Sequence, residues 1–352
     1  MLVTQQPVLR RFWYPVTPMS ALADGPKPFR LLGEDIVLWL AEGGIPVALA
    51  DRCCHRTARL SRGYCDRNRL VCGYHGWEFD PTGRVVRVPQ SGAEEDRPTR
   101  MSVPHFRAEA RYGYVWVALD DPLYALPALA EASEPGFRQV DEFYEVWNCA
   151  GLRVMENSFD NAHFSFVHRK SFGDQGHPVP SKLDIEQRDD GFVMTTEVPV
   201  INPEAQMKLL HMDSNRTVRH MRQQWFMPFV RNLRISYPNG MVHTILTAAT
   251  PIDDRTSQLV QFAFRNDTEE QAPAKDVIAF DRVVTNEDRY ILESTDHDVP
   301  LDQIGSELNM ASDRPGILMR KMLLELLARH GEAETRLRQP ERPERPIRLA
   351  AG

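Results

Sequence analysis

Short apolar runs separated by turn residues fill the chain between residues 35 and 118. The runs cover residues 35–40, 47–50, 70–72, 85–88 and 114–118, with glycine, proline and aspartate between them. The segment Asp80-Pro81-Thr82-Gly83 is a strong turn signal between two of the runs. Runs this short and this closely spaced predict a small antiparallel β domain at the N-terminal end of the chain.

Beyond residue 122 the chain carries longer periodic segments. Alternating apolar positions between residues 191 and 265 predict a second antiparallel sheet. Residues 151–170 predict a helix followed by an irregular turn. Apolar residues at helical spacing predict two further helices, over residues 274–294 and 318–327.

The turn at residues 120–122 separates the two patterns, so we place a domain boundary there. A length of 352 residues also favours two cores over one. The prediction is an α+β protein, with an all-β domain over residues 1–121 and a helix-and-sheet domain over residues 122–330. Residues 331–352 are rich in Glu, Arg and Pro, and we expect an extended or poorly ordered tail.

Composition narrows the function classes. Hydrophobic residues make up 42% and charged residues 26%, as in soluble globular proteins. The formal net charge is −7 without a basic block, so we expect no nucleic-acid surface. The longest apolar stretch, residues 36–50, is interrupted by Glu42 and Pro46 and is too short to span a bilayer. Residues 1–11 lack the apolar core of a signal peptide, and we therefore expect a cytoplasmic protein.

The cysteines indicate a metal site. Five are present, and four of them lie within residues 53–72. An odd number in a protein expected to be cytoplasmic argues against a disulfide scaffold. Cys65 and Cys149 stand outside any ligand spacing, and small core residues are the expected role for both.

Two ligand pairs stand out in this region. Cys53 and His55 form a C-x-H pair, and Cys72 and His75 form a C-x-x-H pair. Two thiolates and two imidazoles fit either tetrahedral zinc or a Rieske [2Fe–2S] cluster, in which the cysteines bind one iron and the histidines the other. The small residues beside the ligands leave backbone N–H groups free for bridging sulfides, which a zinc site does not need. We therefore favour the cluster.

A second group of ligand types lies further along the chain. Asn157, Asp160 and His163 recur at intervals of three, which on a helix places them on one face. His163 and His168 are five residues apart, about 140° of helical rotation, so the helix must loosen or end before both can face one metal. Two histidines and a carboxylate make the facial triad of non-haem iron oxygenases.

The third ligand of such a triad must come from a distant segment. Asp288 is our choice, because Val284, Ile291 and Leu292 surround it at helical spacing. Glu287 also has apolar neighbours and remains an alternative from the sequence alone, with residue Glu293 a weaker one.

Both groups of residues resemble one family. The run 51–56 together with 71–77 resembles the Rieske domain of the Rieske non-haem iron oxygenases, and the D-x-x-H-x-x-x-x-H pattern at 160–168 is similar to their catalytic domain. The resemblance covers about residues 8–300, and residues 11–16 and 155–158 fit the single-component monooxygenase branch. Caffeine N-demethylase, the vanillate and dicamba O-demethylases, toluenesulfonate methyl-monooxygenase and the saxitoxin-pathway hydroxylases belong to this branch.

The resemblance carries further expectations. It implies a helix-grip catalytic domain, a homotrimer, a Rieske [2Fe–2S] cluster and a mononuclear Fe(II). In the family the counterpart of Asp160 bridges the two centres, hydrogen-bonding the equivalent of His163 in one subunit and of His75 in the next. Because the chain has no nucleotide-binding motif, a separate NAD(P)H-dependent reductase, with or without a ferredoxin, is expected to supply electrons.

The expected function is O2-dependent monooxygenation of a small aromatic or heteroaromatic substrate, with oxidative N- or O-demethylation as the first expectation. Ring or aliphatic hydroxylation by the same iron remains open, and an electron carrier and a zinc-binding module are the alternatives of another class. For substrate contacts we name His243, Trp225, Phe280 and Asn157, although core packing is the commoner role of each such residue.

Overall fold

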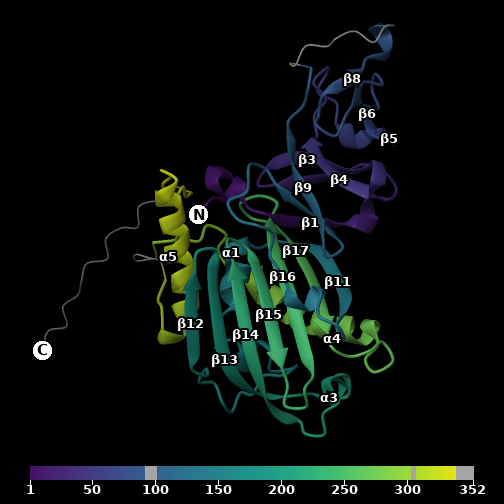
Figure 1. Cartoon of the computed structure of the whole chain (residues 1–352). Helices are drawn as coiled ribbons and strands as arrows, with labels where there is room; N and C mark the ends of the chain where they lie inside the picture. Colours follow the sequence, from purple (N-terminus) through teal and green to yellow (C-terminus); the bar gives the residue numbers. More distant parts are fainter. Residues whose placement is uncertain (92–100, 303–306, 338–352) are drawn as a thin grey trace, which may run out of the picture.

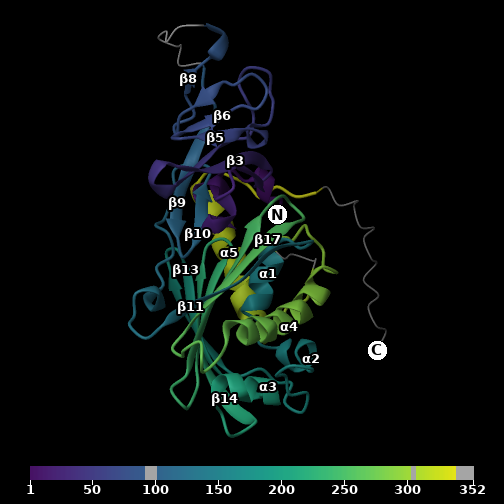
Figure 2. The ribbon, with the colours of Figure 1, turned by 90° about the vertical axis from the view of Figure 1, so that its right-hand side faces the viewer.

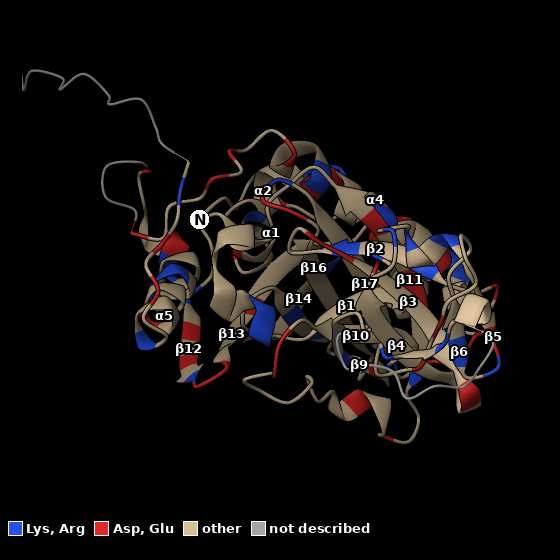
Figure 3. Cartoon of the chain, turned by 90° about the horizontal axis from the view of Figure 1, so that it is seen from above, with Lys and Arg blue, Asp and Glu red and all other residues tan. Residues whose placement is uncertain are grey.

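The computed structural model describes residues 1–91, 101–302 and 307–337. A small β-rich part lies at one end of an elongated molecule, and a large sheet with its helices forms the other part (Figures 1 and 2). The expected α+β class is confirmed. Acidic and basic residues are interspersed along the helices and strands (Figure 3).

Two antiparallel sheets build the N-terminal part. The six-stranded sheet has the order β1-β10-β9-β4-β3-β2, and the four-stranded sheet has the order β5-β6-β7-β8. The strands of the first are β1 (Tyr14–Pro18), β2 (Lys27–Leu31), β3 (Glu34–Ala41), β4 (Ile45–Ala50), β9 (His105–Arg111) and β10 (Tyr114–Ala118). Those of the second are β5 (Tyr64–Asp66), β6 (Arg69–Val71), β7 (Glu78–Phe79) and β8 (Val85–Arg87). Each of the five apolar runs overlaps one of these strands, although the runs 70–72 and 85–88 extend one residue past β6 and β8.

One seven-stranded antiparallel sheet organises the second part, in the order β11-β17-β16-β15-β14-β13-β12. Its strands are β11 (Arg138–Trp147), β12 (Leu183–Arg188), β13 (Gly191–Ile201), β14 (Arg216–Phe226), β15 (Val230–Ser236), β16 (Val242–Pro251) and β17 (Ser257–Arg265). Every residue of β16 and β17 is buried, so both faces of the sheet centre are covered. Aromatic residues of the N-terminal part, among them Tyr114 and Trp116, pack with Leu246 and Phe262 on one face.

Helices cover the other face. They are α1 (Gly151–Ser158), α2 (Phe164–Val167), α3 (Glu204–Leu210), α4 (Ala274–Leu292) and α5 (Arg314–Arg329). Helix α4 crosses the open face of the sheet, with α1 and α2 beside it (Figure 2). Among the described residues, each helix is either too short or too polar to cross a lipid bilayer.

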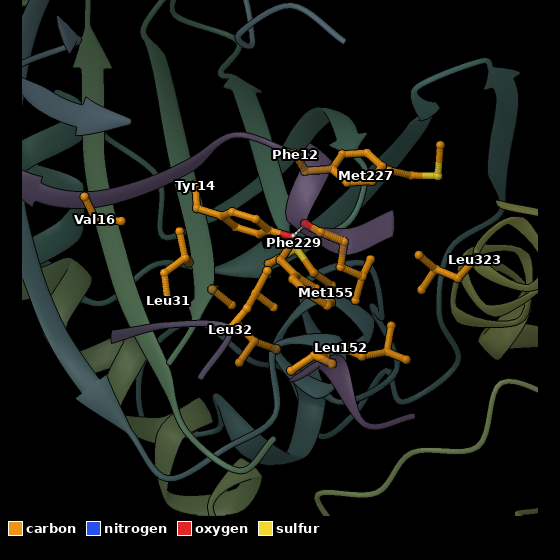
Figure 4. Close-up of a cluster of buried hydrophobic side chains, with 14 of the residues drawn as sticks. Phe12, Tyr14, Val16, Leu31, Leu32, Leu152, Met155, Met227, Phe229 and Leu323 are labelled. Atoms are coloured by element: carbon orange, nitrogen blue, oxygen red, sulfur yellow. Dashed lines mark hydrogen bonds between the residues drawn. The ribbon is translucent and has the colours of Figure 1, made fainter. Parts of the chain in front are cut away.

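A shared core joins the N-terminal segment, α1 and α5. Leu152 and Met155 of α1 pack near Tyr14, Phe229 and Leu323, and the Tyr14 hydroxyl donates to the carbonyl of residue 9 (Figure 4). This core fixes α1, the helix that leads into the second group of ligand-type residues.

The start of the expected tail is held against the body. The Glu332 carboxylate accepts the backbone N–H of Val8 at 2.7 Å, and the Glu334 carboxylate accepts that of Leu301 at 2.9 Å. Residues 338–352 of the tail lie outside the described residues.

Substitution of Met155 tests how much this core contributes to the stability of the fold. Its side chain is 0% exposed, so Met155→Ala should lower the free energy of unfolding by about 2–5 kcal/mol through lost burial and a cavity. The matched control is Met310→Ala, because Met310 is 74% exposed, and it should change stability by about 0.5 kcal/mol or less. Denaturant unfolding of both variants measures the difference, and equal losses would contradict the assignment.

Candidate metal centres and active site

Two tight loops, one after β4 and one after β6, present the first ligand pairs. In each loop a cysteine carbonyl accepts the N–H four residues further on: Cys53 from Thr57 at 2.9 Å, and Cys72 from Gly76 at 3.0 Å. Thr57 and Gly76 close the turns with φ of 60° and 71°. The two loops therefore have matching turns that direct their side chains toward a common centre.

The four ligand-type side chains meet between these loops. Cys53 and Cys72 are each 2% exposed, and the His55 and His75 rings lie 4.6 Å apart. Burial, with the adjacent Cys72 thiol adding to it, raises the pKa of the Cys53 thiol to about 11. Two buried thiols in contact become thiolates together only beside a cation. The donor set therefore fits a metal centre.

The surroundings fit a Rieske cluster in particular. The ring of Trp77 stacks on His55 at 4.5 Å with an interplanar angle of 1°, which fixes the imidazole plane. A Cβ atom on Gly73 would lie 2.7 Å from the carbonyl oxygen of Arg62, so only glycine allows these loops to approach so closely. His55 Nδ1 is buried without a hydrogen-bond partner among the described residues, as expected of a ligand atom.

The expectation that Asn157, Asp160 and His163 share one face of a helix is wrong. Helix α1 ends at Ser158, and α2 begins only at Phe164. The Asp160 carboxylate accepts the backbone N–H of Ala162 at 2.6 Å and that of His163 at 3.3 Å. An aspartate that binds backbone N–H groups in this way caps a new turn rather than continuing a helix.

The break brings two histidines to one aspartate of α4. His163 Nε2 and His168 Nε2 lie 3.2 Å apart, and Asp288 Oδ1 lies 3.5 and 3.3 Å from them. Asp288 Oδ1 is buried and has no hydrogen-bond donor among the described residues. These three atoms can hold one metal ion from one side.

A carboxylate contacts the Nδ1 atom of each imidazole, on the side of the ring opposite the converging Nε2 atoms. Asp160 Oδ2 lies 3.2 Å from His163 Nδ1, and Glu287 Oε2 lies 2.9 Å from His168 Nδ1. A carboxylate on Nδ1 keeps the proton there and leaves Nε2 with a free lone pair, the arrangement of metal-binding histidines. Residue Glu293 instead accepts from the backbone N–H of Asn148, away from the cluster.

A cavity with about 880 Å³ of empty space, its opening included, begins at this cluster. Of the residues named for substrate contacts, the structure places Asn157, Phe280 and His243 in its wall. Apolar side chains from the sheet and from α4 complete the middle of the wall.

The expectation that Trp225 contacts substrate is wrong. Trp225 shares a face of β14 with Arg219, which does line the cavity, but it lies at the opposite end of the strand. There it packs against Phe192 and donates its indole N–H to the carbonyl of Pro228. Strand alternation gives the face of a side chain but not its position along the cavity.

The sequence analysis did not single out Asp281 and Arg219, which line the cavity, or Glu142, which lies near Asp281. Asp281 lies seven residues before Asp288, two helical turns along the same face of α4, and this spacing could have identified it. His243 lies opposite Asp281 at 3.4 Å. Neither Glu142 nor Arg219 belongs to a motif or a spacing that distinguishes it from a charged residue on the surface.

Comparisons with known proteins agree with both sites. Residues 12–107 match the Rieske [2Fe-2S] domain, and residues 147–329 match the vanillate O-demethylase oxygenase C-terminal domain. Methylxanthine N1-demethylase NdmA of Pseudomonas putida is 30% identical over 341 residues, covering 94% of this chain and 92% of the relative. Methylxanthine N3-demethylase NdmB of the same organism is 30% identical, covering 92% and 91%.

Solved structures give the same picture. Pseudomonas putida NdmA with caffeine has a TM-score of 0.81 and 27% identity and covers 93% of both chains. Dicamba monooxygenase bound to dicamba, at 20% identity and a TM-score of 0.78, shares the fold. These matches imply a Rieske cluster in the first domain and a mononuclear iron in the second. The chain belongs to the Rieske non-haem iron oxygenases, in the group with a vanillate O-demethylase-type catalytic domain.

Proposed function

We propose that this protein is the terminal oxygenase of an oxidative demethylase acting on small N-methyl or O-methyl aromatic or heteroaromatic compounds. The observation that carries the proposal is a mostly apolar cavity that begins at His163, His168 and Asp288. The demethylases among the relatives support it. A zinc module or an electron carrier would leave this cluster and its cavity without a role.

Cys53 and Cys72 hold one iron of the cluster, and His55 and His75 hold the other. His163, His168 and Asp288 hold the mononuclear iron, with Glu287 outside the ligand set because it contacts the far nitrogen of His168. When bound, the two centres supply electron transfer and O2 activation.

The overall reaction is a two-electron monooxygenation. The methyl compound, O2, two electrons and two protons give the hydroxymethyl compound and water. The hydroxymethyl compound then loses formaldehyde and leaves a free N–H or O–H group. A separate NAD(P)H-dependent reductase, acting directly or through a ferredoxin, supplies the electrons. The chain's contribution is to orient the methyl group beside the cluster on α4 and to shield it from water.

We also propose a homotrimer in which each cluster serves the neighbouring subunit. Within one chain the loops around β5–β8 lie at one end of the molecule, away from α1, α2 and α4 (Figure 2). Asp160, which is partly exposed beside His163, is the proposed link to His75 of the neighbour. The domain boundary near residue 121 is part of this proposal, and the two family matches lie on either side of it.

The decisive experiment is a substrate screen. The purified holoprotein, a surrogate reductase, NADH and a panel of N-methyl and O-methyl aromatics should yield formaldehyde and demethylated product in equal amounts. Hydroxylated product without formaldehyde would replace demethylation by hydroxylation. A preparation without acid-labile sulfide would overturn the proposal as a whole.

The assignment of the third ligand gives a separate prediction. Asp288→Ala should lose the mononuclear iron, so the ratio of iron to acid-labile sulfide should fall from three to two toward two to two. Glu287→Gln, the matched control, should retain the iron with an affinity weakened by about 10–100-fold, because an outer hydrogen bond is altered. Metal and sulfide analysis measures both, and the reverse pattern would assign the ligand to Glu287.

Asp160→Asn tests the proposed link. The variant should keep both metal centres and lower turnover by about 10–100-fold, because the amide no longer holds His163 as a carboxylate does. Stopped-flow reoxidation of the reduced cluster, with substrate and O2, should slow by a similar factor. Asp174→Asn is the control, since this half-buried carboxylate pairs with His177 and Arg216 and accepts the N–H of Gly176, and none of these belongs to the iron site. Near-normal turnover of Asp160→Asn would remove the bridging role.

A further inference from the structure

Three acceptor atoms meet in and beside the cavity wall, two helical turns along α4 from Asp288. They are His243 Nε2, Asp281 Oδ2 and Glu142 Oε1, and the ligand-capable atoms of these residues lie within 4.8 Å of one another. All three atoms are buried, and none has a hydrogen-bond partner among the described residues. We call these residues the acceptor cluster. Buried acceptors without donors are costly, so the cluster calls for a donor from outside the chain.

Three different elements, α4, β16 and β11, bring the side chains of the acceptor cluster together. Asp281 and Asp288 are seven residues apart, about 10 Å along the helix axis, on the face of α4 that the sheet covers. His243 extends from β16 to within 3.4 Å of Asp281. Glu142 sits at a β-bulge of β11, between Asp141 and Phe143, where the register with β17 shifts. A bulge of this kind redirects one side chain without disturbing the strand.

The protonation states of the acceptor cluster leave its atoms able to accept hydrogen bonds. Burial raises the pKa of both Glu142 and Asp281, so the two carboxyls do not ionise together. One proton on the pair still leaves lone pairs on its oxygens that can accept a further hydrogen bond. Burial also lowers the pKa of His243, and nearby arginines act in the same direction, so its ring is neutral. The outer oxygen of Glu142 accepts from the Gln261 amide at 2.6 Å. His243 and Asp281 line the cavity and therefore present acceptor atoms to it, whereas Glu142 lies beside them without lining the cavity.

The arginines near the acceptor cluster do not pair with it. Arg265 is paired with Asp267, and Arg138 is paired with Asp267 and Glu269. Arg219 lines the cavity with its guanidinium 4.3 Å from the centre of the Phe172 ring. Arg219 forms no ion pair with the acceptor cluster in the described part of the chain, and two of its nitrogens are without partners there. It can therefore bind a carbonyl beside a group held by the cluster.

We propose that the acceptor cluster binds an N–H group of the substrate, so that the enzyme selects neutral or cationic nitrogen compounds over carboxylates. This inference rests on the proposed function and deepens it by naming the substrate class. The methyl group lies at the Asp288 end and the N–H group at the Asp281 end. Between them the wall is apolar, with Ile245, Phe280 and Val284, and suits a flat ring.

A matched pair of probes tests the proposal. The compounds 4-methoxybenzamide and 4-methoxybenzoate have the same shape and differ by an NH2 group in place of one carboxylate oxygen. Isothermal titration of the anaerobic holoprotein should show at least tenfold tighter binding of the amide. The carboxylate brings no N–H donor and places a negative charge against Asp281 and Glu142.

Variants of the cluster should remove the preference. Asp281→Asn and Glu142→Gln each replace an acceptor by an amide that can donate, so the affinity ratio of amide to benzoate should fall at least tenfold. Asp276→Asn, on the exposed side of the same helix, is the control and should leave the ratio unchanged. Circular dichroism and sulfide content establish that each variant is folded, and the wild-type ratio tests the proposal without any variant.

Three outcomes would overturn the inference. Equal or tighter binding of the benzoate would make Arg219 the determinant of specificity. An unchanged ratio in both cluster variants would remove the cluster from recognition. A divalent metal beyond the two iron centres, lost from both variants, would make the cluster a metal site. Titration needs neither O2 nor reductase, so a preserved amide preference without formaldehyde would count against the demethylase function alone.

Discussion

Buried or half-buried ligand-type side chains that the fold gathers without a counter-ion dominate the chemistry of this protein. Ligand-type groups gather without a counter-ion from the described part of the chain at three places: the thiols of Cys53 and Cys72, the converging atoms of His163, His168 and Asp288, and the acceptor cluster. Each arrangement is unfavourable until a cation or a donor from outside the chain enters it. The fold maintains these costly groups because the surrounding sheets and helices contribute enough apolar burial to offset them.

Helix α4 connects two of these places. It lies over a sheet whose other face is covered by the N-terminal part. One face of the helix presents Asp288 to the histidines and Asp281 to His243. The helix thereby sets the distance between the site of oxidation and the site of recognition, and the apolar wall between them sets the shape of what fits.

The third place lies in another part of the molecule. The loops with Cys53 and Cys72 follow β4 and β6, in the small β-rich part at one end of the molecule (Figure 1). Their turns and the stacked Trp77 hold the ligands without contact to α4. A single chain therefore contains both kinds of centre but separates them, and this separation is the structural basis for proposing that neighbouring subunits cooperate.

The sequence by itself determined the elements and the ligand pairs, because strand and helix periodicity and the C-x-H and C-x-x-H spacings are local properties of the chain. It left Asp288 and Glu287 unresolved, since adjacent helical residues differ only in which neighbour they meet. It also placed Trp225 in the wrong surroundings and extended α1 past Ser158. Only the tertiary structure decided these points, together with the position of Glu142. They depend on long-range packing, on a bulge in one strand and on the Asp160 carboxylate capping a turn, and none of these leaves a periodic trace in the sequence.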